Sequence, residues 1–252
     1  MDTTVVLAEH GAVATVTLNN PSKLNVLSAT TFGQLRNIVD AIATRDDIEC
    51  VVLTGAGRSF CAGHSLDAIG DGADEAEARY HEAETIDALE ALPMPTIAAI
   101  RGHCLTGGLE LALSCDLLIA TEDASVGDTH GQWGLVPVWG MSIRLPERIG
   151  WARAKELTFT SRRISGVEAA AIGLVNKAVP ADELDAAVAT LTAEIVANSS
   201  GSNRIAKKLY AQSKVLERTR ALAKERDLEF GLPADSVDRL TQSHVAKAQN
   251  RT

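Results

Sequence analysis

The segment from Pro95 to Ala120, PTIAAIRGHCLTGGLELALSCDLLIA, constrains the fold more than any other part of the chain. Its first apolar run, at 96–100, predicts a strand, and the run at 117–120 predicts another. Between them, a Gly-Gly pair at 107–108 opens an apolar helix. Strands that alternate with helices in this way are typical of an α/β fold with a largely parallel sheet.

The residues before Pro95 continue this alternation. Ser28 has the residue type and position of an N-cap for an amphipathic helix, and the glycine-rich stretch 58–74 shows no sustained period. The other predicted elements are two short strands within 4–18, a helix over 29–43, a buried strand over 50–53 and a helix over 75–92. Residues 12–120 therefore predict a parallel-rich α/β architecture.

The chain becomes mostly helical after Ser165. Ser165 and Glu168 have the S-x-x-E spacing of a capping box, and a short strand is predicted over 175–179. Apolar residues at helical spacing then predict two long amphipathic helices, at 182–197 and within 203–229. These helices have more apolar surface than one core can cover, which favours an oligomer.

Composition excludes several classes of function. The 252 residues include 24 Lys and Arg against 33 Asp and Glu, a net charge of −9. This charge argues against a nucleic-acid partner, which requires a basic surface. No stretch approaches the ~18 apolar residues of a membrane span, so no membrane partner is expected. The four cysteines follow no CxxC spacing and there is no secretory signal pattern, which predicts reduced thiols, no metal and a cytoplasmic location.

Two segments have residues suited to chemistry, SFCAGHSLD at 59–67 and HCLTGGLE at 103–110. Glycine lets a backbone N–H approach a ligand closely, and a helix N-terminus supplies further free N–H groups. Such a corner can stabilise a developing oxyanion, and Glu110, one turn into the helix, can exchange protons there. A glycine pair before an apolar helix is, however, more often a plain strand-to-helix turn. Neither a P-loop nor a G-x-G-x-x-G pattern is present in this segment.

Taken together, several motifs resemble those of the crotonase (enoyl-CoA hydratase/isomerase) superfamily. The resemblance extends from about Val13 to Val179 and more loosely into the last helices. It rests on VTLNNPSKLNVLS, SFCAGHSLD, PTIAAIRGHCLTGGLELALSCDLLIA, GLVP at 134–137 and SRRISGVEAAAIGLVNKAVP. The resemblance implies a spiral of repeated β-β-α units over 1–195. It also implies a C-terminal helical region over 196–252 that assembles trimers, which are often paired into hexamers.

The resemblance further implies an acyl-CoA thioester as the ligand. By motif match, the backbone N–H groups of His64 and Gly107 form the oxyanion hole for the thioester oxygen. The residues expected to contact the substrate or its coenzyme A are Lys23, Leu24, Ala62, His64, Ser65, Leu66, Asp67 and Gly107. No metal or redox cofactor is implied, because coenzyme A arrives as part of the substrate.

Hydratases of this family place two glutamates beside the substrate double bond. The first matches Glu110, whereas the position of the second is occupied by His130. A histidine can still exchange protons near neutral pH. The leading interpretation is therefore reversible hydration of a 2-enoyl-CoA to a 3-hydroxyacyl-CoA. The alternatives are an acyl-CoA decarboxylase or hydrolase that uses His64 and His130, and a non-catalytic acyl-CoA binder.

Overall fold

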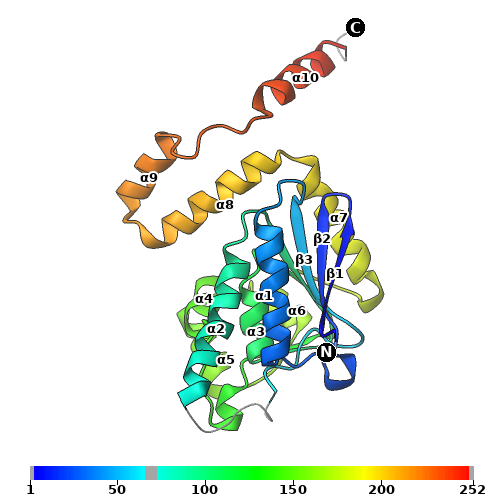
Figure 1. Cartoon of the computed structure of the whole chain (residues 1–252), viewed down its shortest axis with the longest axis vertical. Helices are drawn as coiled ribbons and strands as arrows, with labels where there is room; N and C mark the ends of the chain where they lie inside the picture. The colour runs from blue at the N-terminus through cyan, green and yellow to red at the C-terminus, as the bar shows by residue number, and fades with distance from the viewer. Residues whose placement is uncertain (1–2, 66–72, 250–252) are drawn as a thin grey trace.

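A six-stranded sheet forms the centre of the computed structural model, which describes residues 3–65 and 73–249. The first pair of strands is antiparallel, and each later pair is parallel (Figure 1). In sheet order the strands are β1 (Val5–His10), β2 (Val13–Leu18), β3 (Cys50–Gly55), β4 (Thr96–Ile100), β6 (Leu117–Thr121) and β9 (Lys177–Val179). The prediction of a parallel-rich α/β fold is confirmed.

Strands of the large sheet lead directly into strands of a second, smaller sheet. It consists of β5 (His103–Leu105), β7 (Ser125–Gly127) and β8 (Ile164–Ser165). Strand β4 of the large sheet leads within a few residues into β5 of the small sheet, and β6 leads into β7 in the same way. A helix follows β5, so strand, strand and helix recur as a unit. This arrangement is the predicted spiral of β-β-α units.

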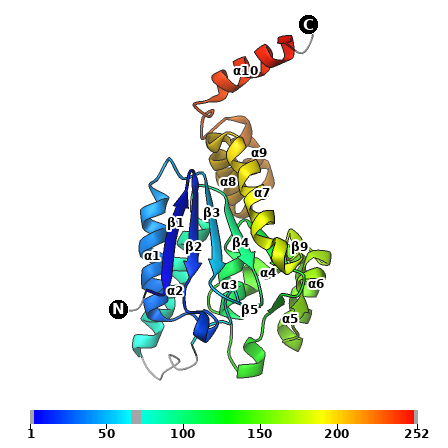
Figure 2. The ribbon, with the colours of Figure 1, turned by 90° about the vertical axis from the view of Figure 1, so that its right-hand side faces the viewer.

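The central strands β3, β4 and β6 bury side chains on both faces of the large sheet, because helices cover both faces. In β3, Val51 and Leu53 face one cluster of apolar side chains, whereas Cys50 and Val52 face the other. This split follows from the two-residue period of a strand. The first face is covered by helices α1 (Ala29–Ala43), α2 (Ala73–Glu90) and α3 (Gly107–Leu113), and the second by α7 (Leu184–Ala197) (Figure 2).

Local signals place several of these elements as predicted. The Ser28 hydroxyl accepts a hydrogen bond from the backbone N–H of Thr31, so it caps α1. The Ser165 hydroxyl likewise accepts from the N–H of Glu168 and caps α6 (Gly166–Ala171). The Glu168 carboxylate, however, accepts from Arg162, so the reciprocal half of the predicted capping box is replaced by an ion pair. The remaining helices of the core are α4 (Met141–Ile149) and α5 (Trp151–Thr160).

The C-terminal region departs from the prediction of one helix within 203–229. Helix α8 (Ser200–Val215) ends where Leu216 becomes extended, and α9 (Arg218–Arg226) begins after Glu217. The Glu217 carboxylate accepts hydrogen bonds from the N–H groups of Thr219 and Arg220 in the first turn of α9, which makes a new helix start favourable at this point. A last helix, α10 (Ser236–Gln249), extends away from the core (Figure 1). No helix among the described residues is long and apolar enough to cross a membrane.

Helices α7 and α8 connect the C-terminal region to the core. Leu184 and Val188 of α7 pack against the second face of the sheet. The Arg204 guanidinium of α8 donates to the carbonyl oxygens of Arg45 (2.9 Å) and Ile48 (2.8 Å). The predicted boundary between residues 195 and 196 falls inside α7, and the division into a core and an oligomerisation region stays a prediction.

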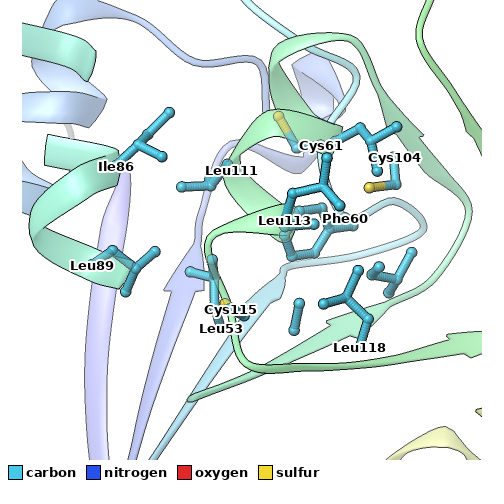
Figure 3. Packing of buried hydrophobic residues seen from close by; sticks show 14 of the residues in the cluster. Leu53, Phe60, Cys61, Ile86, Leu89, Cys104, Leu111, Leu113, Cys115 and Leu118 are labelled. Carbon is cyan, nitrogen blue, oxygen red and sulfur yellow. The ribbon is translucent and has the colours of Figure 1, made fainter. Parts of the chain in front are cut away.

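All four cysteines are buried and free, and several lie together in the aliphatic core (Figure 3). Burial raises the pKa of the Cys61 thiol to about 12, and burial likewise raises the pKa values of Cys50 and Cys115 to about 12. Because the thiolate is the reactive form, these thiols are protonated and unreactive at neutral pH. The interpretation of the cysteines as small core residues is confirmed.

We expect Ellman's reagent to modify no cysteine in the native protein at pH 8 and to modify four after denaturation. Burial and protonation both protect the thiols in the folded chain. The absorbance of the released thionitrobenzoate measures both states, and a denatured sample is the control. Stoichiometric labelling of the native protein within seconds would contradict the expectation.

Candidate active site

Gly107 and Gly108 form the turn that starts α3, here called the glycine corner, and this turn lies against the 61–65 segment. Cys61 and Cys104 pair in a parallel β-bridge, which brings the two segments together. Gly63 has φ +113°, a conformation that residues with a side chain rarely adopt. A Cβ at Gly63 would lie 3.3 Å from the Leu105 carbonyl oxygen and 3.8 Å from the Gly107 nitrogen. The glycine therefore allows the two backbones to approach closely.

The N–H groups of His64 and Gly107 donate no hydrogen bond within the described part of the chain. The groups beside them are engaged: Leu27 N–H donates to the Gly63 carbonyl oxygen, and Ser65 N–H donates to the Leu27 carbonyl oxygen, each at 2.8 Å. At the start of α3, the N–H groups of the third and fourth residues donate to the Thr106 carbonyl oxygen. Two unused donors thus occur on adjacent segments, as an oxyanion hole requires.

Trp139 covers this corner. A Cβ at Gly107 would overlap the Trp139 ring, so only glycine fits under the indole. The same ring makes edge-on contacts with the ring of His64, at a centroid distance of 5.4 Å, and with the ring of Phe32, at 4.9 Å. The indole therefore packs between α1 and the two segments that supply the unused N–H groups.

Glu110 lies one turn into α3 and is 1% exposed, so its carboxyl group is in the interior of the protein. Its Oε1 accepts hydrogen bonds from the backbone N–H groups of Trp139 (2.9 Å) and Met141 (3.1 Å). Its Oε2 has no hydrogen-bond partner among the described residues and lies 3.6 Å from Nε2 of His130. Burial raises the pKa of Glu110, and the opposing effects of His130 and the two N–H donors only partly offset this. One carboxylate oxygen is thus fixed and the other is left for chemistry.

His130 begins a short 3-10 turn (His130–Trp133) after β7 and is buried. Its Nδ1 lies 2.6 Å from Oδ1 of Asp128, and its backbone N–H donates to the same oxygen at 3.2 Å. The Thr158 hydroxyl donates to Oδ2 of Asp128 at 2.8 Å. Burial would raise the pKa of Asp128, but hydrogen bonds from His130 and Thr158 outweigh it and lower the pKa. An imidazole thus connects two buried carboxylates, and its ring nitrogens face them from different sides.

The His64 side chain lies near the corner without pointing to Glu110. Its Nε2 is 3.3 Å from Oε1 of Glu82, a buried residue of α2, and its Nδ1 is 3.1 Å from the Ser65 carbonyl oxygen. The structure therefore separates two histidines with different partners, one beside each half of the corner.

The loop that holds Glu110 is itself held by Arg144. The Arg144 guanidinium donates to the Trp139 carbonyl oxygen (2.6 Å) and to Glu90 of α2 (2.8 Å). Gly140 has φ +104°, and a Cβ there would overlap the same guanidinium. This contact fixes the backbone from which two N–H groups reach Glu110.

Only some of the residues predicted to contact coenzyme A are shown to lie next to one another. Ala62 N–H donates to the Leu24 carbonyl oxygen at 3.0 Å, so these two segments are adjacent. Lys23 ends a 3-10 turn (Pro21–Lys23) and is exposed, and Ser65 follows His64 directly. Leu66 and Asp67 lie outside the described residues. Binding of coenzyme A here stays a prediction.

Sequence reasoning missed four contributors to the site: Asp128, Glu82, Trp139 as the cover of Gly107, and the backbone N–H of Met141. The Asp-x-His spacing of 128 and 130 was a usable signal, because a turn can fold a carboxylate onto a nearby imidazole. Glu82 carried no local signal. Among the described residues, no group of three His, Cys, Asp or Glu side chains is arranged to hold a metal ion.

Comparison with known proteins decides the family. The sequence model of the enoyl-CoA hydratase/isomerase family matches residues 8–243. The chain belongs to this family. The short-chain-enoyl-CoA hydratase of Clostridium acetobutylicum is 34% identical over 225 residues, which cover 88% of this chain and 86% of the relative.

Solved structures of the enoyl-CoA hydratase/isomerase family agree with this fold. The structure of an enoyl-CoA hydratase from Bacillus anthracis has a TM-score of 0.91 and 34% identity, and the match covers 98% of this chain and 97% of the other. A Thermobifida fusca protein, solved in complex with acetoacetyl-CoA, has a TM-score of 0.84 and 29% identity over 95% of each chain. The present chain is thus a crotonase-fold protein along nearly its whole length.

Proposed function

We propose that this protein is an enoyl-CoA hydratase, which adds water reversibly to a 2-enoyl-CoA to give a 3-hydroxyacyl-CoA. The observation that carries the proposal is the buried Glu110. Its Oε2 has no hydrogen-bond partner among the described residues and lies beside His130, one helical turn from the unused Gly107 N–H. A buried carboxyl group with a raised pKa is suited to general acid/base catalysis.

In this proposal, the thioester oxygen binds the N–H groups of His64 and Gly107. Water adds its oxygen to C3 while Glu110 Oε2 removes one of its protons. The electron pair of the double bond moves toward the thioester oxygen, and the resulting enolate is stabilised by the two N–H donors. Protonated His130 Nε2 then gives a proton to C2. Transfer of the proton from Glu110 to His130 over the 3.6 Å between Oε2 and Nε2 restores the starting state.

Coenzyme A would enter as part of the substrate and contact Lys23, Leu24, Ala62 and the 64–67 segment. No step of this route calls for a metal or a redox cofactor. The cytoplasmic location predicted from the four free thiols remains part of the proposal.

A histidine-based decarboxylase or hydrolase is the second candidate, because the paired His64 and Glu82 lie beside the same N–H groups. A screen of the purified protein separates the two. We expect turnover of crotonyl-CoA or longer enoyl-CoAs, measured as loss of the ultraviolet absorbance of the conjugated enoyl thioester, and no release of CO₂ from methylmalonyl-CoA. Decarboxylation without hydration would replace the proposal with the second candidate, and binding without any turnover would leave a non-catalytic acyl-CoA binder.

We also propose that the protein assembles as a homotrimer or hexamer through its C-terminal helices. Large apolar side chains are exposed along these helices, including Tyr210, Val215, Val237 and Leu240, and Leu232 is exposed in the segment between α9 and α10. An exposed apolar surface of this kind is typical of an interface.

Multi-angle light scattering at micromolar concentration is expected to give a mass three or six times the 26.6 kDa of one chain. Replacing Val237 and Leu240 with Asp would place charges on the apolar surface and should shift the mass toward that of the monomer. A monomeric wild-type protein at this concentration would contradict the assembly.

A further inference from the structure

We propose that Asp128 is a positioning residue that fixes one tautomer of His130, so that its Nε2 is the nitrogen that exchanges protons at the active site. The inference rests on the proposed function and adds to it a residue for which the sequence suggested no role. Asp128 is fully buried and does not face the Glu110 side of the imidazole; it acts through His130.

Hydrogen-bond geometry determines which nitrogen keeps its proton. An ionised carboxylate can only accept hydrogen bonds, so Nδ1 of His130, 2.6 Å from Asp128 Oδ1, must carry the hydrogen. The lowered pKa of Asp128 keeps this carboxylate ionised at neutral pH. Nε2 is then the nitrogen that can lose and regain a proton, and it is the one that faces Oε2 of Glu110.

The position of Asp128 is itself determined by three donors. The backbone N–H and Nδ1 of His130 both donate to Oδ1, and the Thr158 hydroxyl of α5 donates to Oδ2. A buried charge is costly unless it is hydrogen-bonded, and these contacts supply the required partners. The carboxylate cannot turn away without losing at least one of them, so the imidazole has a fixed acceptor on its Nδ1 side.

Such a support matters because His130 must alternate between two states during turnover. In the protonated state both nitrogens carry hydrogen, and in the neutral state only Nδ1 does. Without Asp128, the neutral ring can place its hydrogen on Nε2, where it would donate to Glu110 and could not accept a proton from it. The wrong tautomer removes the acid/base function while leaving the thioester contacts intact.

The test is a double-mutant cycle on crotonyl-CoA hydration. Asp128→Asn is expected to lower kcat about 10²–10⁴-fold, with KM changed less than about threefold because the N–H groups that hold the thioester remain. In the His130→Ala background, the same substitution should cost less than about twofold, since Asp128 acts only through His130. Thr158→Val, which removes one support of Asp128, is the milder variant and should show a smaller loss that also disappears in the His130→Ala background.

The ¹⁵N chemical shifts of the His130 ring provide a measurement that needs no turnover. They should show hydrogen on Nδ1 in the neutral wild-type ring and a mixture of tautomers in Asp128→Asn. Additive losses in the cycle, or an unchanged tautomer in Asp128→Asn, would overturn the inference. If wild-type protein hydrates no enoyl-CoA, the proposed function fails, and the ring shifts alone decide for or against Asp128. If Asp128→Asn does not fold, Thr158→Val decides both readouts.

Discussion

Replacing Glu110 with glutamine is expected to lower kcat for crotonyl-CoA hydration by about 10²–10⁴-fold, the usual cost of losing a general acid/base. Glutamine keeps the shape of the side chain, and its carbonyl oxygen can still accept the N–H groups of Trp139 and Met141. It cannot exchange a proton at the position of Oε2. The loss should therefore fall on kcat rather than on KM.

His130→Ala is the comparison that separates the roles of the two side chains. If His130 supplies the second proton, its loss should approach that of Glu110→Gln, and the double variant should be little worse than either single one. Wild-type rates in Glu110→Gln combined with an inactive His130→Ala or His64→Ala would reject the hydratase mechanism and favour a histidine-based decarboxylase or hydrolase.

Melting temperatures show whether the Glu110→Gln variant is folded. The difference in melting temperature between the variant and wild type also has an expected sign. Because burial raises the folded-state pKa of Glu110, ionising this group disfavours the folded state once the pH exceeds the unfolded-state pKa. Its contribution to stability is therefore present at low pH and is lost as the pH rises through the folded-state pKa. Glu110→Gln should raise the melting temperature at pH 8 relative to wild type, and this difference should shrink toward pH 4. A melting temperature lowered at pH 8 would contradict this account of the buried carboxyl.

Removing the Gly107 N–H is expected to lower kcat about 10²–10³-fold, the cost of one oxyanion-hole donor. Gly107→Pro removes this donor, and proline is tolerated at the first position of a helix. Proline also adds a Cβ, however, and Trp139 occupies the space that a Cβ would need. The fall in kcat of the proline variant therefore combines two effects, the loss of the N–H donor and the displacement of the Trp139 indole.

Gly107→Ala is the matched control, because it adds the same Cβ and keeps the N–H. The rate lost between the alanine and proline variants measures the donor, whereas the loss between wild type and alanine measures the displacement of Trp139. Affinity for free coenzyme A, measured by calorimetry, should change little in either variant. Equal kcat values in the two variants, with melting temperatures that show both are folded, would reject Gly107 as an oxyanion donor.

The sequence alone determined the elements whose causes are local. The cap at Ser28, the strand at 96–100 and the glycine corner at 107–108 each depend on residues within a few positions of one another, or on a two- or 3.6-residue period. The break at Leu216 is also local, but its signal is a single carboxylate, Glu217, inside an otherwise helical pattern. One polar group can end a helix that periodicity alone would continue.

Only the tertiary structure decided how the candidate site is assembled. The sequence placed Glu110 and His130 near a glycine corner, but their 3.6 Å approach follows from the parallel pairing of β5 with β7, which brings the segments after the two strands together. The partners of Glu110 Oε1 are backbone N–H groups, which every residue except proline has and no sequence pattern marks. Likewise, the pairing of His64 with Glu82 depends on where α2 crosses the corner. Contacts between residues that are close in the sequence can be predicted from their spacing. Contacts between separate helices and strands depend on how the chain folds, and many different sequences adopt the same fold, so no local pattern predicts them.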